Sequence, residues 1–288
     1  MNLGGTFTFP QTNITVSRMG YGAMQLAGPH VFGPPKDHAA ALSVLREAVS
    51  SGVNHIDTSD FYGPHITNQI IKEALHPYPA DLTLVTKVGA RRGSDGSWIL
   101  DREPASLRSQ VQDNLKNLGV DSLTIVNMRL GDVASPNDDT IVKQVEELAS
   151  MQREGLIQHI GLSTVTQKQY ESVRSVAKIV CVQNLYNLAH REDDSFVDFL
   201  AKEGVAFVPY FPLGGFTPLQ SSTLDEVAQS LGQPPMAVAQ AWLLHRAANI
   251  LLIPGTSSLK HLRENLAAAS LTLSEETMLK LNTIGLSN

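Results

Sequence analysis

Three residues whose chemistry could act together lie at or just beyond the ends of two short apolar segments. The segment 53–57 ends in a carboxylate, Asp57, and a phenol, Tyr62, follows five residues later. The segment 82–88 is apolar until it reaches Lys87. A lysine near the end of a buried strand needs a partner of opposite charge. We therefore expect Lys87 to pair with Asp57, close to Tyr62.

This set of side chains suits the reduction of a carbonyl group by hydride transfer. Hydride addition leaves an alkoxide, so the protein must supply a proton or a strong hydrogen bond to that oxygen. A free tyrosine has a pKa of about 10, and an ammonium held beside the phenol lowers that pKa. In this interpretation Tyr62 is the acid, Lys87 tunes it and Asp57 anchors Lys87. On spacing alone, a plain buried ion pair with Tyr62 as a rim aromatic is equally open.

Short apolar segments alternate with amphipathic segments along the chain. Apolar and polar residues alternate in 6–17, which predicts a β-hairpin. The pattern then predicts strands at residues 19–24, 53–57, 82–87, 123–128, 157–162, 179–183, 205–209 and 250–253. It predicts helices at residues 37–50, 67–75, 104–118, 138–153, 167–177, 193–202, 224–231, 236–245, 259–268 and 274–284.

The alternation favours an α/β fold, a closed (β/α)8 TIM barrel with an N-terminal β-hairpin and a C-terminal extra helix. No composition break or linker divides the chain, so we expect one domain over residues 1–288. A doubly wound sheet is disfavoured because no Gly-x-Gly-x-x-Gly turn follows a predicted strand. In a barrel the active face lies at the carboxyl ends of the strands, which is where the candidate residues fall.

The composition points to a small-molecule protein. The 288 residues are 42% hydrophobic and carry a net charge of −6. The chain therefore lacks the excess of positive charge that is typical of proteins that bind nucleic acid or an anionic membrane. We expect no signal peptide, since residues 1–10 lack a basic region followed by an apolar core, and no membrane span, since His245 and Arg246 interrupt the apolar run 241–253. The single cysteine, Cys181, excludes an internal disulfide and a cysteine-rich metal site. A cytoplasmic monomer or weak homo-oligomer without a metal is expected.

The strings HIDTSDFYG (55–63) and LVTKVG (84–89) resemble the aldo-keto reductase family, and the resemblance extends along almost the whole chain. Within that family, several longer strings resemble the bacterial pyridoxal reductases: GYGAMQLAGP, FGPP, FYGPH, VTKVGARRG, VPYFPLGGFTPLQSSTL and LLIPGTSS. The resemblance implies an NADP(H)-dependent enzyme that reduces an aldehyde to a primary alcohol. Pyridoxal is the favoured substrate.

The family's catalytic set normally includes a histidine, and this sequence departs from it. The matching strand places Arg129 at that position, and Asn127 lies two residues back on the same side of the strand. Arg129 could hydrogen-bond the carbonyl oxygen and depress the pKa of Tyr62, but it cannot act as an acid. Asn127 is a second candidate donor, and a structural salt bridge is the alternative role for Arg129.

The family match also implies the cofactor surface. The nicotinamide end is expected at Ser163, Thr164, Gln183, Tyr210, Leu213 and Gly214, with the Tyr210 ring stacked on the nicotinamide. A Gly-containing turn with three hydroxyls opens the helix 259–268, and a helix N-terminus attracts anions. The match therefore implies a 2′-phosphate and adenine site at Thr256, Ser257, Ser258, Lys260, Glu264 and Asn265. Spacing alone is also typical of a serine-rich helix cap with a solvated lysine.

Two loops after the strands, 89–103 and 214–223, are expected to shape the substrate pocket. The expected pocket residues are Met24, Trp98, Asn127 and Phe216. A flat heteroaromatic aldehyde could stack on Trp98 or Phe216, with polar substituents that reach Arg91 or Arg92. Three other functions are open from the sequence. The first is a general aldehyde or ketone reductase of unknown substrate, and the second is a cofactor-binding, redox-sensing regulatory subunit. The third is an aldolase or isomerase with Lys87 as a Schiff-base nucleophile.

Overall fold

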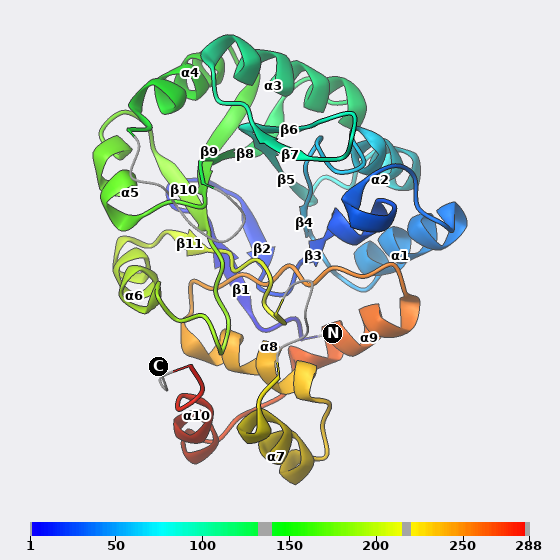
Figure 1. Ribbon diagram of the computed structural model, residues 1–288, viewed down its shortest axis with the longest axis vertical. Coiled ribbons are helices and arrows are strands. Elements are labelled where there is room, and N and C mark those ends of the chain that lie inside the picture. Colours follow the sequence, from blue (N-terminus) through cyan, green and yellow to red (C-terminus); the bar gives the residue numbers. More distant parts are fainter. Residues whose placement is uncertain (1, 132–139, 215–219, 286–288) are drawn as a thin grey trace.

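The computed structural model describes residues 2–131, 140–214 and 220–285. Helices surround a curled sheet of seven strands (Figure 1). The strand order is β11-β10-β9-β8-β5-β4-β3, and every neighbouring pair is parallel. The strands are β3 (Tyr21–Gly22), β4 (His55–Asp57), β5 (Thr83–Val88), β8 (Leu123–Arg129), β9 (Ile157–Ser163), β10 (Ile179–Gln183) and β11 (Ala206–Phe207).

Residues 250–255 close the sheet into a barrel. Leu251 N donates to Phe207 O at 2.9 Å on the β11 side, while Leu252 N donates to Arg18 O at 2.8 Å on the β3 side. Single bridges join Phe207 to Ile250, Met19 to Leu252 and Gly22 to Gly255. The expected strand 250–253 therefore takes its place in the barrel through isolated bridges and not as a regular strand. The (β/α)8 fold class is confirmed.

The helices follow the strands as the alternation predicted. They are α1 (His38–Ser50), α2 (Ile66–Leu75), α3 (Pro104–Leu118), α4 (Val142–Arg153), α5 (Gln167–Val173), α6 (Asp194–Glu203), α7 (Ser222–Leu231), α8 (Pro235–Arg246), α9 (Leu259–Ala268) and α10 (Glu275–Leu281). Two short 3₁₀ turns, Ala23–Leu26 and Pro29–Val31, follow β3. Local chemistry sets several helix ends. Pro104 begins α3, and Gly119 ends it in the left-handed conformation that glycine tolerates.

The N-terminal hairpin packs against the inside of the barrel. It pairs β1 (Thr6–Thr8) with β2 (Thr15–Ser17) in antiparallel register. Phe9 and Val16 are buried in one apolar cluster with inward residues of the strands, among them Val85 and Ile125. Figure 1 shows the hairpin across the barrel opening, and the contact of Phe9 with His55, the first residue of β4, places it at the end where the strands begin.

Further local expectations differ from the structure, besides the strand at 250–253. The strand expected over 19–24 is limited to Tyr21–Gly22, and a 3₁₀ turn begins at Ala23. An antiparallel pair, β6 (Ala90–Arg92) with β7 (Trp98–Leu100), lies within the segment expected to be a plain loop. The helix expected from 138 begins at Val142, with 138–139 outside the described residues. The helix expected to reach 177 ends at Val173, and only turn structure follows. Across the described ranges, no helix is both long and apolar enough to cross a membrane.

Candidate active site

Asp57 and Lys87 form a buried ion pair at the carboxyl ends of β4 and β5. Lys87 Nζ lies 2.5 Å from Asp57 Oδ1 and also donates to Thr58 O at 2.9 Å. Both side chains are at most 5% exposed. Burial alone lowers the pKa of Lys87, but Asp57 and Tyr62 together raise it above its ordinary value. Lys87 is therefore held as an ammonium, which makes it a poor nucleophile for a Schiff base.

The Tyr62 phenol lies directly beside this pair. Lys87 Nζ is 5.3 Å from the centroid of the Tyr62 ring. Burial raises the pKa of Tyr62 above its ordinary value, and Lys87 provides the largest opposing influence. The expectation that Lys87 lowers this pKa is correct for that one contribution, but burial outweighs it. Tyr62 is consequently protonated at neutral pH and has a proton to give.

Gln183, at the end of β10, supports Asp57 from across the barrel. Its Nε2 donates to Asp57 Oδ2 at 2.9 Å. Each carboxylate oxygen of Asp57 therefore has a donor, Lys87 on one and Gln183 on the other. This arrangement fixes Gln183 Oε1 as the free end of the amide, since the carboxylate can only accept.

A cavity of about 350 Å³ opens above these residues. Its lining joins the catalytic candidates to aromatic residues and to the turns after β3 and after residue 252. The lining residues are Gly22, Met24, Gln25, Asp57, Phe61, Tyr62, Lys87, Trp98, Arg129, Gln183, Tyr210, Phe211, Pro212, Leu213, Met236, Ile253, Pro254 and Gly255.

Arg129 and Asn127 lie on the same strand, β8, but at different depths. Arg129 lines the cavity, and its charge lowers the pKa of Tyr62, after the larger influences of burial, Lys87 and Asp57. Asn127 is fully buried and pairs in register with Lys87. Its Oδ1 accepts from Cys181 Sγ at 3.2 Å, and it does not line the cavity. Arg129 is thus the better placed of the two to approach a substrate oxygen.

The expected nicotinamide residues lie together at the ends of β9 and β10. Ser163 pairs in register with Gln183. Ser163 Oγ and Gln183 Oε1 are buried and have no hydrogen-bond partner among the described residues. Such atoms are costly unless a ligand or water satisfies them. A carboxamide, with one acceptor and an NH₂ donor, matches a hydroxyl and an amide oxygen, so these residues fit a nicotinamide.

Tyr210 completes this side of the cavity. Its hydroxyl lies 3.3 Å from Thr164 Oγ1, and its backbone N donates to Asn184 O at 3.0 Å. Thr164 itself adopts a left-handed backbone conformation, φ 59°, which is uncommon for threonine. Leu213 lines the same cavity, whereas Gly214 lies just beyond it. Tyr210 is therefore held at the cavity wall through its hydroxyl and through its backbone.

The turn before α9 acts as a helix cap in this structure. Ser258 Oγ accepts from His261 N at 3.4 Å, and Thr256 Oγ1 accepts from Ser258 N at 3.0 Å. Lys260 is 80% exposed and lies 3.8 Å from Glu264. Ser257 lines a neighbouring cavity. The structure therefore does not gather the expected 2′-phosphate residues into the main cavity, and the Ser258 hydroxyl caps the N-terminus of α9.

Asn265, the last of the expected adenine contacts, is already engaged. Its Oδ1 accepts from Gln240 Nε2 at 2.7 Å, which ties α9 to α8. Elsewhere along the described chain, no cluster of three or more His, Cys, Asp or Glu side chains could hold a metal ion.

The aromatic wall of the cavity comes from the loops after β4 and β5. Phe61 contacts Tyr62 and Trp98 edge to face, with centroids 5.3 and 5.7 Å apart. Trp98 is 39% exposed, so one side of its ring is open. Met24 also lines the wall. Phe216, the other expected stacking residue, lies outside the described residues.

The two arginines expected to reach a substrate do not line the cavity. The Arg92 guanidinium stacks on Trp98 at 3.9 Å and donates to Val31 O at 2.7 Å and Gly96 O at 2.6 Å. Arg91 lies on the other side of β6 and pairs with Asp101 at 3.4 Å. Alternation along β6 separates the two side chains. Arg92 instead stabilises the antiparallel pair of β6 and β7, which carries Trp98.

Several lining residues were not expected from the sequence. Phe61 could have been inferred because it precedes Tyr62 in the same turn. Met236 comes from α8, far along the chain from Tyr62, and nothing in its sequence neighbourhood indicates a cavity. Gln25, Phe211 and Pro212 enter because two chain turns converge at the barrel mouth.

Comparison with known proteins gives consistent matches. A family model for the aldo/keto reductase family matches residues 18–285. Pyridoxine 4-dehydrogenase from Escherichia coli (strain K12) is 61% identical over 279 residues, covering 96% of this chain and 98% of that protein. A thermostable aldo-keto reductase solved with the inhibitor epalrestat has a TM-score of 0.81 at 28% identity, covering 97% and 99% of the two chains. An aldo-keto reductase from Klebsiella pneumoniae solved in complex with NADPH has a TM-score of 0.77 at 20% identity, covering 96% and 94%.

Proposed function

Because the chain belongs to the aldo/keto reductase family and is an oxidoreductase acting on carbonyl or CH–OH groups, we propose that it reduces an aldehyde with NADPH. We propose pyridoxal, reduced to pyridoxine, as the substrate. The observation that carries the proposal is the Asp57–Lys87 pair, buried beside Tyr62 at the cavity wall.

Each residue of the site has a separate role in the proposed reduction. Tyr62 donates its proton to the oxygen that becomes an alkoxide, because burial keeps the phenol protonated in neutral solution. Lys87 stabilises the phenolate that remains, and Asp57 with Gln183 holds Lys87 in place. Arg129 adds a second positive charge at the cavity, close enough to Tyr62 to lower its pKa.

The proposed cofactor is NADP(H), which supplies a hydride when bound. Ser163 and Gln183 would hold the carboxamide, and Tyr210 would offer its ring to the nicotinamide. At the other end, the N-terminus of α9 with Ser257, Ser258 and Lys260 would face the 2′-phosphate. The Klebsiella pneumoniae structure in complex with NADPH supports nicotinamide cofactor use on this fold.

The substrate proposal follows from the identity with the Escherichia coli pyridoxine 4-dehydrogenase, since that protein's name describes the reverse oxidation. The shape and lining of the cavity also suit this substrate. It presents flat aromatic walls at Phe61, Trp98 and Tyr210 and a small polar set at its base, which suits a flat heteroaromatic ring. Arg91 and Arg92 are engaged elsewhere, so we expect the phosphorylated aldehyde to be the poorer substrate.

The test is loss of NADPH absorbance with a panel of aldehydes at matched concentrations. We expect pyridoxal to give the highest kcat/KM, above pyridoxal phosphate and nitrobenzaldehyde. If nitrobenzaldehyde is far better and pyridoxal is barely turned over, the substrate proposal fails although the reductase activity stands. Titration of NADPH and NADH by fluorescence quenching completes the test, and equal dissociation constants would contradict the NADPH preference.

A further inference from the structure

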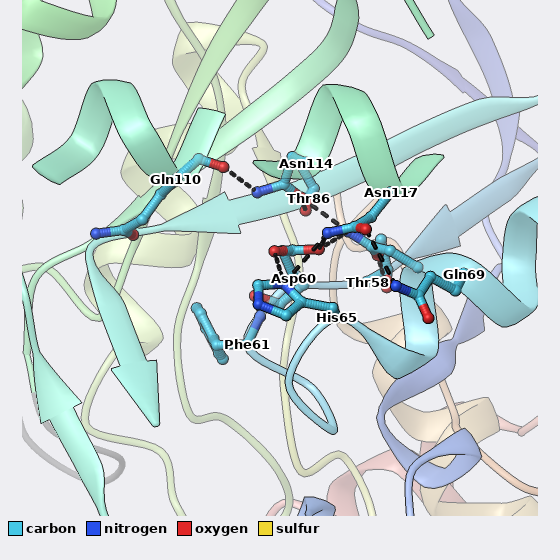
Figure 2. Close-up of polar contacts among 11 residues, drawn as sticks. Thr58, Asp60, Phe61, His65, Gln69, Thr86, Gln110, Asn114 and Asn117 are labelled. Atoms are coloured by element: carbon cyan, nitrogen blue, oxygen red, sulfur yellow. Dashed lines mark hydrogen bonds and ion pairs between the residues drawn. The ribbon is translucent and has the colours of Figure 1, made fainter. Parts of the chain in front are cut away.

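A buried polar cluster ties together the outer sides of the two strands that carry the ion pair. Thr58 and Thr86 point away from the barrel interior, because side chains alternate along a strand. Thr58 Oγ1 donates to Asn68 Oδ1 at 2.8 Å, and Thr86 Oγ1 donates to Asn114 Oδ1 at 2.5 Å. Asn68 Nδ2 joins the two by donating to Asn114 Oδ1 at 3.0 Å. Helices α2 and α3 thereby connect the ends of β4 and β5 (Figure 2).

Asp60 is the acceptor at the centre of this cluster. Its Oδ1 accepts from Asn117 Nδ2 at 2.9 Å and from Asn68 Nδ2 at 3.1 Å, and its Oδ2 lies 2.6 Å from His65 Nδ1. Asp60 is 6% exposed. Figure 2 shows its carboxylate between the side chains from α2 and α3. A single carboxylate therefore anchors its own turn to two helices.

The anchored turn is the one that carries Tyr62. Its backbone is held by Tyr62 N donating to Ser59 O at 3.1 Å and by His65 N donating to Asp60 O at 2.7 Å. His65 has a left-handed backbone, φ 67°, so the turn relies on fixed contacts at that point. Asp60 points to the helices, and Tyr62, two residues on, lines the cavity. The hydrogen-bonded backbone of the turn is the link through which Asp60 can position Tyr62.

We propose that Asp60, held by Asn68, Asn117 and His65, is a positioning residue that fixes the Tyr62 phenol beside Lys87 for proton donation. This inference rests on the proposed reduction for its catalytic consequence. The anchoring itself is a property of the turn and is measurable without substrate. Misplacement of a catalytic group by about 1 Å lowers rates on the order of 10²-fold, so loss of the anchor has a large kinetic effect even though Asp60 touches no substrate.

The variants are chosen to separate the anchor from general damage. Asp60→Ala removes the shared acceptor, so Asn68 Nδ2 keeps only its bond to Asn114 Oδ1 and Asn117 Nδ2 keeps only its contact with His65 Nδ1. Asp60→Asn keeps an oxygen for those donors and serves as the conservative rescue. Glu73→Ala is the matched control, because Glu73 also pairs with a histidine, His38, at 2.9 Å, but both side chains are about half exposed and lie on the outer face of α1 and α2.

Amide hydrogen exchange followed by mass spectrometry tests the anchoring directly on the cofactor-free protein. We expect Asp60→Ala to speed exchange in peptides covering 58–65, while peptides from β9 and β10 keep the exchange of the unaltered protein. Asp60→Asn and Glu73→Ala should leave the 58–65 peptides close to unaltered. Unchanged exchange in Asp60→Ala would overturn the proposal, whether or not the protein reduces any aldehyde.

The catalytic consequence is tested by a double-mutant cycle with Tyr62→Phe. Asp60→Ala should lower kcat about 10- to 100-fold, with KM and NADPH affinity within a few-fold of the starting values, and Asp60→Asn should recover most of the loss. In the Tyr62→Phe background, Asp60→Ala should lower kcat little further, because it acts through the missing phenol. A full, multiplicative loss in that background would overturn the positioning role.

A second site covers the case in which Asp60→Ala does not fold. Asn117 lies on α3, outside the turn, so Asn117→Ala removes one donor to Asp60 and leaves the turn's own residues unchanged. The same faster exchange at 58–65 and a smaller fall in kcat are expected. Failure to see the faster exchange in this variant counts against the proposal. If the unaltered protein reduces no aldehyde, the proposed function fails, and the exchange results alone decide on the anchor.

Discussion

Replacing Lys87 by methionine tests whether the ion pair of Asp57 and Lys87 is catalytic or only structural. Lys87 Nζ donates to Asp57 Oδ1 at 2.5 Å and to Thr58 O at 2.9 Å, with the side chain 3% exposed. In Lys87→Met the Asp57 carboxylate stays buried and keeps only the Gln183 donor at 2.9 Å. Breaking a buried pair on one side costs about 3 to 5 kcal/mol of unfolding free energy. We expect a loss in that range by urea unfolding at neutral pH.

The double variant Lys87→Met with Asp57→Asn sharpens the measurement. It removes both charges, so the uncompensated carboxylate is gone and part of the lost stability should return. Carbonyl reduction should be largely lost in both variants, because neither retains the ammonium that stabilises the Tyr62 phenolate. A loss below about 1 kcal/mol in the single variant, or a double variant less stable than the single one, would refute this reasoning. Retained turnover in the more stable double variant would make the pair structural.

Three further predictions concern residues around this pair. Arg129→Met should lower kcat and shift the alkaline limb of the kcat–pH profile upward, because Arg129 lowers the Tyr62 pKa; an unchanged profile would make the arginine structural. Burial lowers the pKa of His55 to about 4, below an unfolded value near 6.5. The unfolded chain then binds more protons between these values, so stability is complete above about pH 6.5 and falls by about 3 kcal/mol as the pH drops to about 4. In His55→Gln, the free energy of unfolding measured with urea should fall less steeply from pH 7 to pH 4 than in the unaltered protein. An equally steep fall would contradict the role of His55 in this pH dependence. Lys260→Ala should weaken NADPH binding a few-fold and leave NADH binding unchanged, since an exposed charge contributes below about 1 kcal/mol; equal effects on both cofactors would remove Lys260 from the phosphate site.

The barrel was predictable because each strand is a short apolar run and each helix carries an apolar face. The exceptions have local causes. Residues 250–255 include Pro254 and Gly255, and the close approach of Gly22 to Ile253 O leaves no room for a side chain there. The β6–β7 pair lacks an apolar alternation, since two arginines occupy β6 and Arg92 is buried by stacking on Trp98. Burial of an arginine by an aromatic ring is a tertiary event that spacing does not indicate.

The candidate site was predictable to the extent that strand ends meet in a barrel. Asp57 and Lys87 lie on adjacent strands, so their pairing follows from topology and charge. The hydrogen bond from Gln183 to Asp57 crosses the barrel and depends on side-chain orientation, which the sequence does not indicate. The net direction of the Tyr62 pKa likewise depended on burial, which was not known from the neighbouring residues alone.

The most direct test of the account is the turnover of pyridoxal with NADPH by Tyr62→Phe, with Tyr78→Phe as the matched control. Tyr78 donates to Leu118 O at 2.7 Å and is not among the cavity residues. We predict that Tyr62→Phe loses on the order of 10² to 10⁴ in kcat, with NADPH affinity unchanged by fluorescence titration, while Tyr78→Phe keeps its turnover. Near-normal kcat in a folded Tyr62→Phe protein would contradict the assignment of Tyr62 as the proton donor.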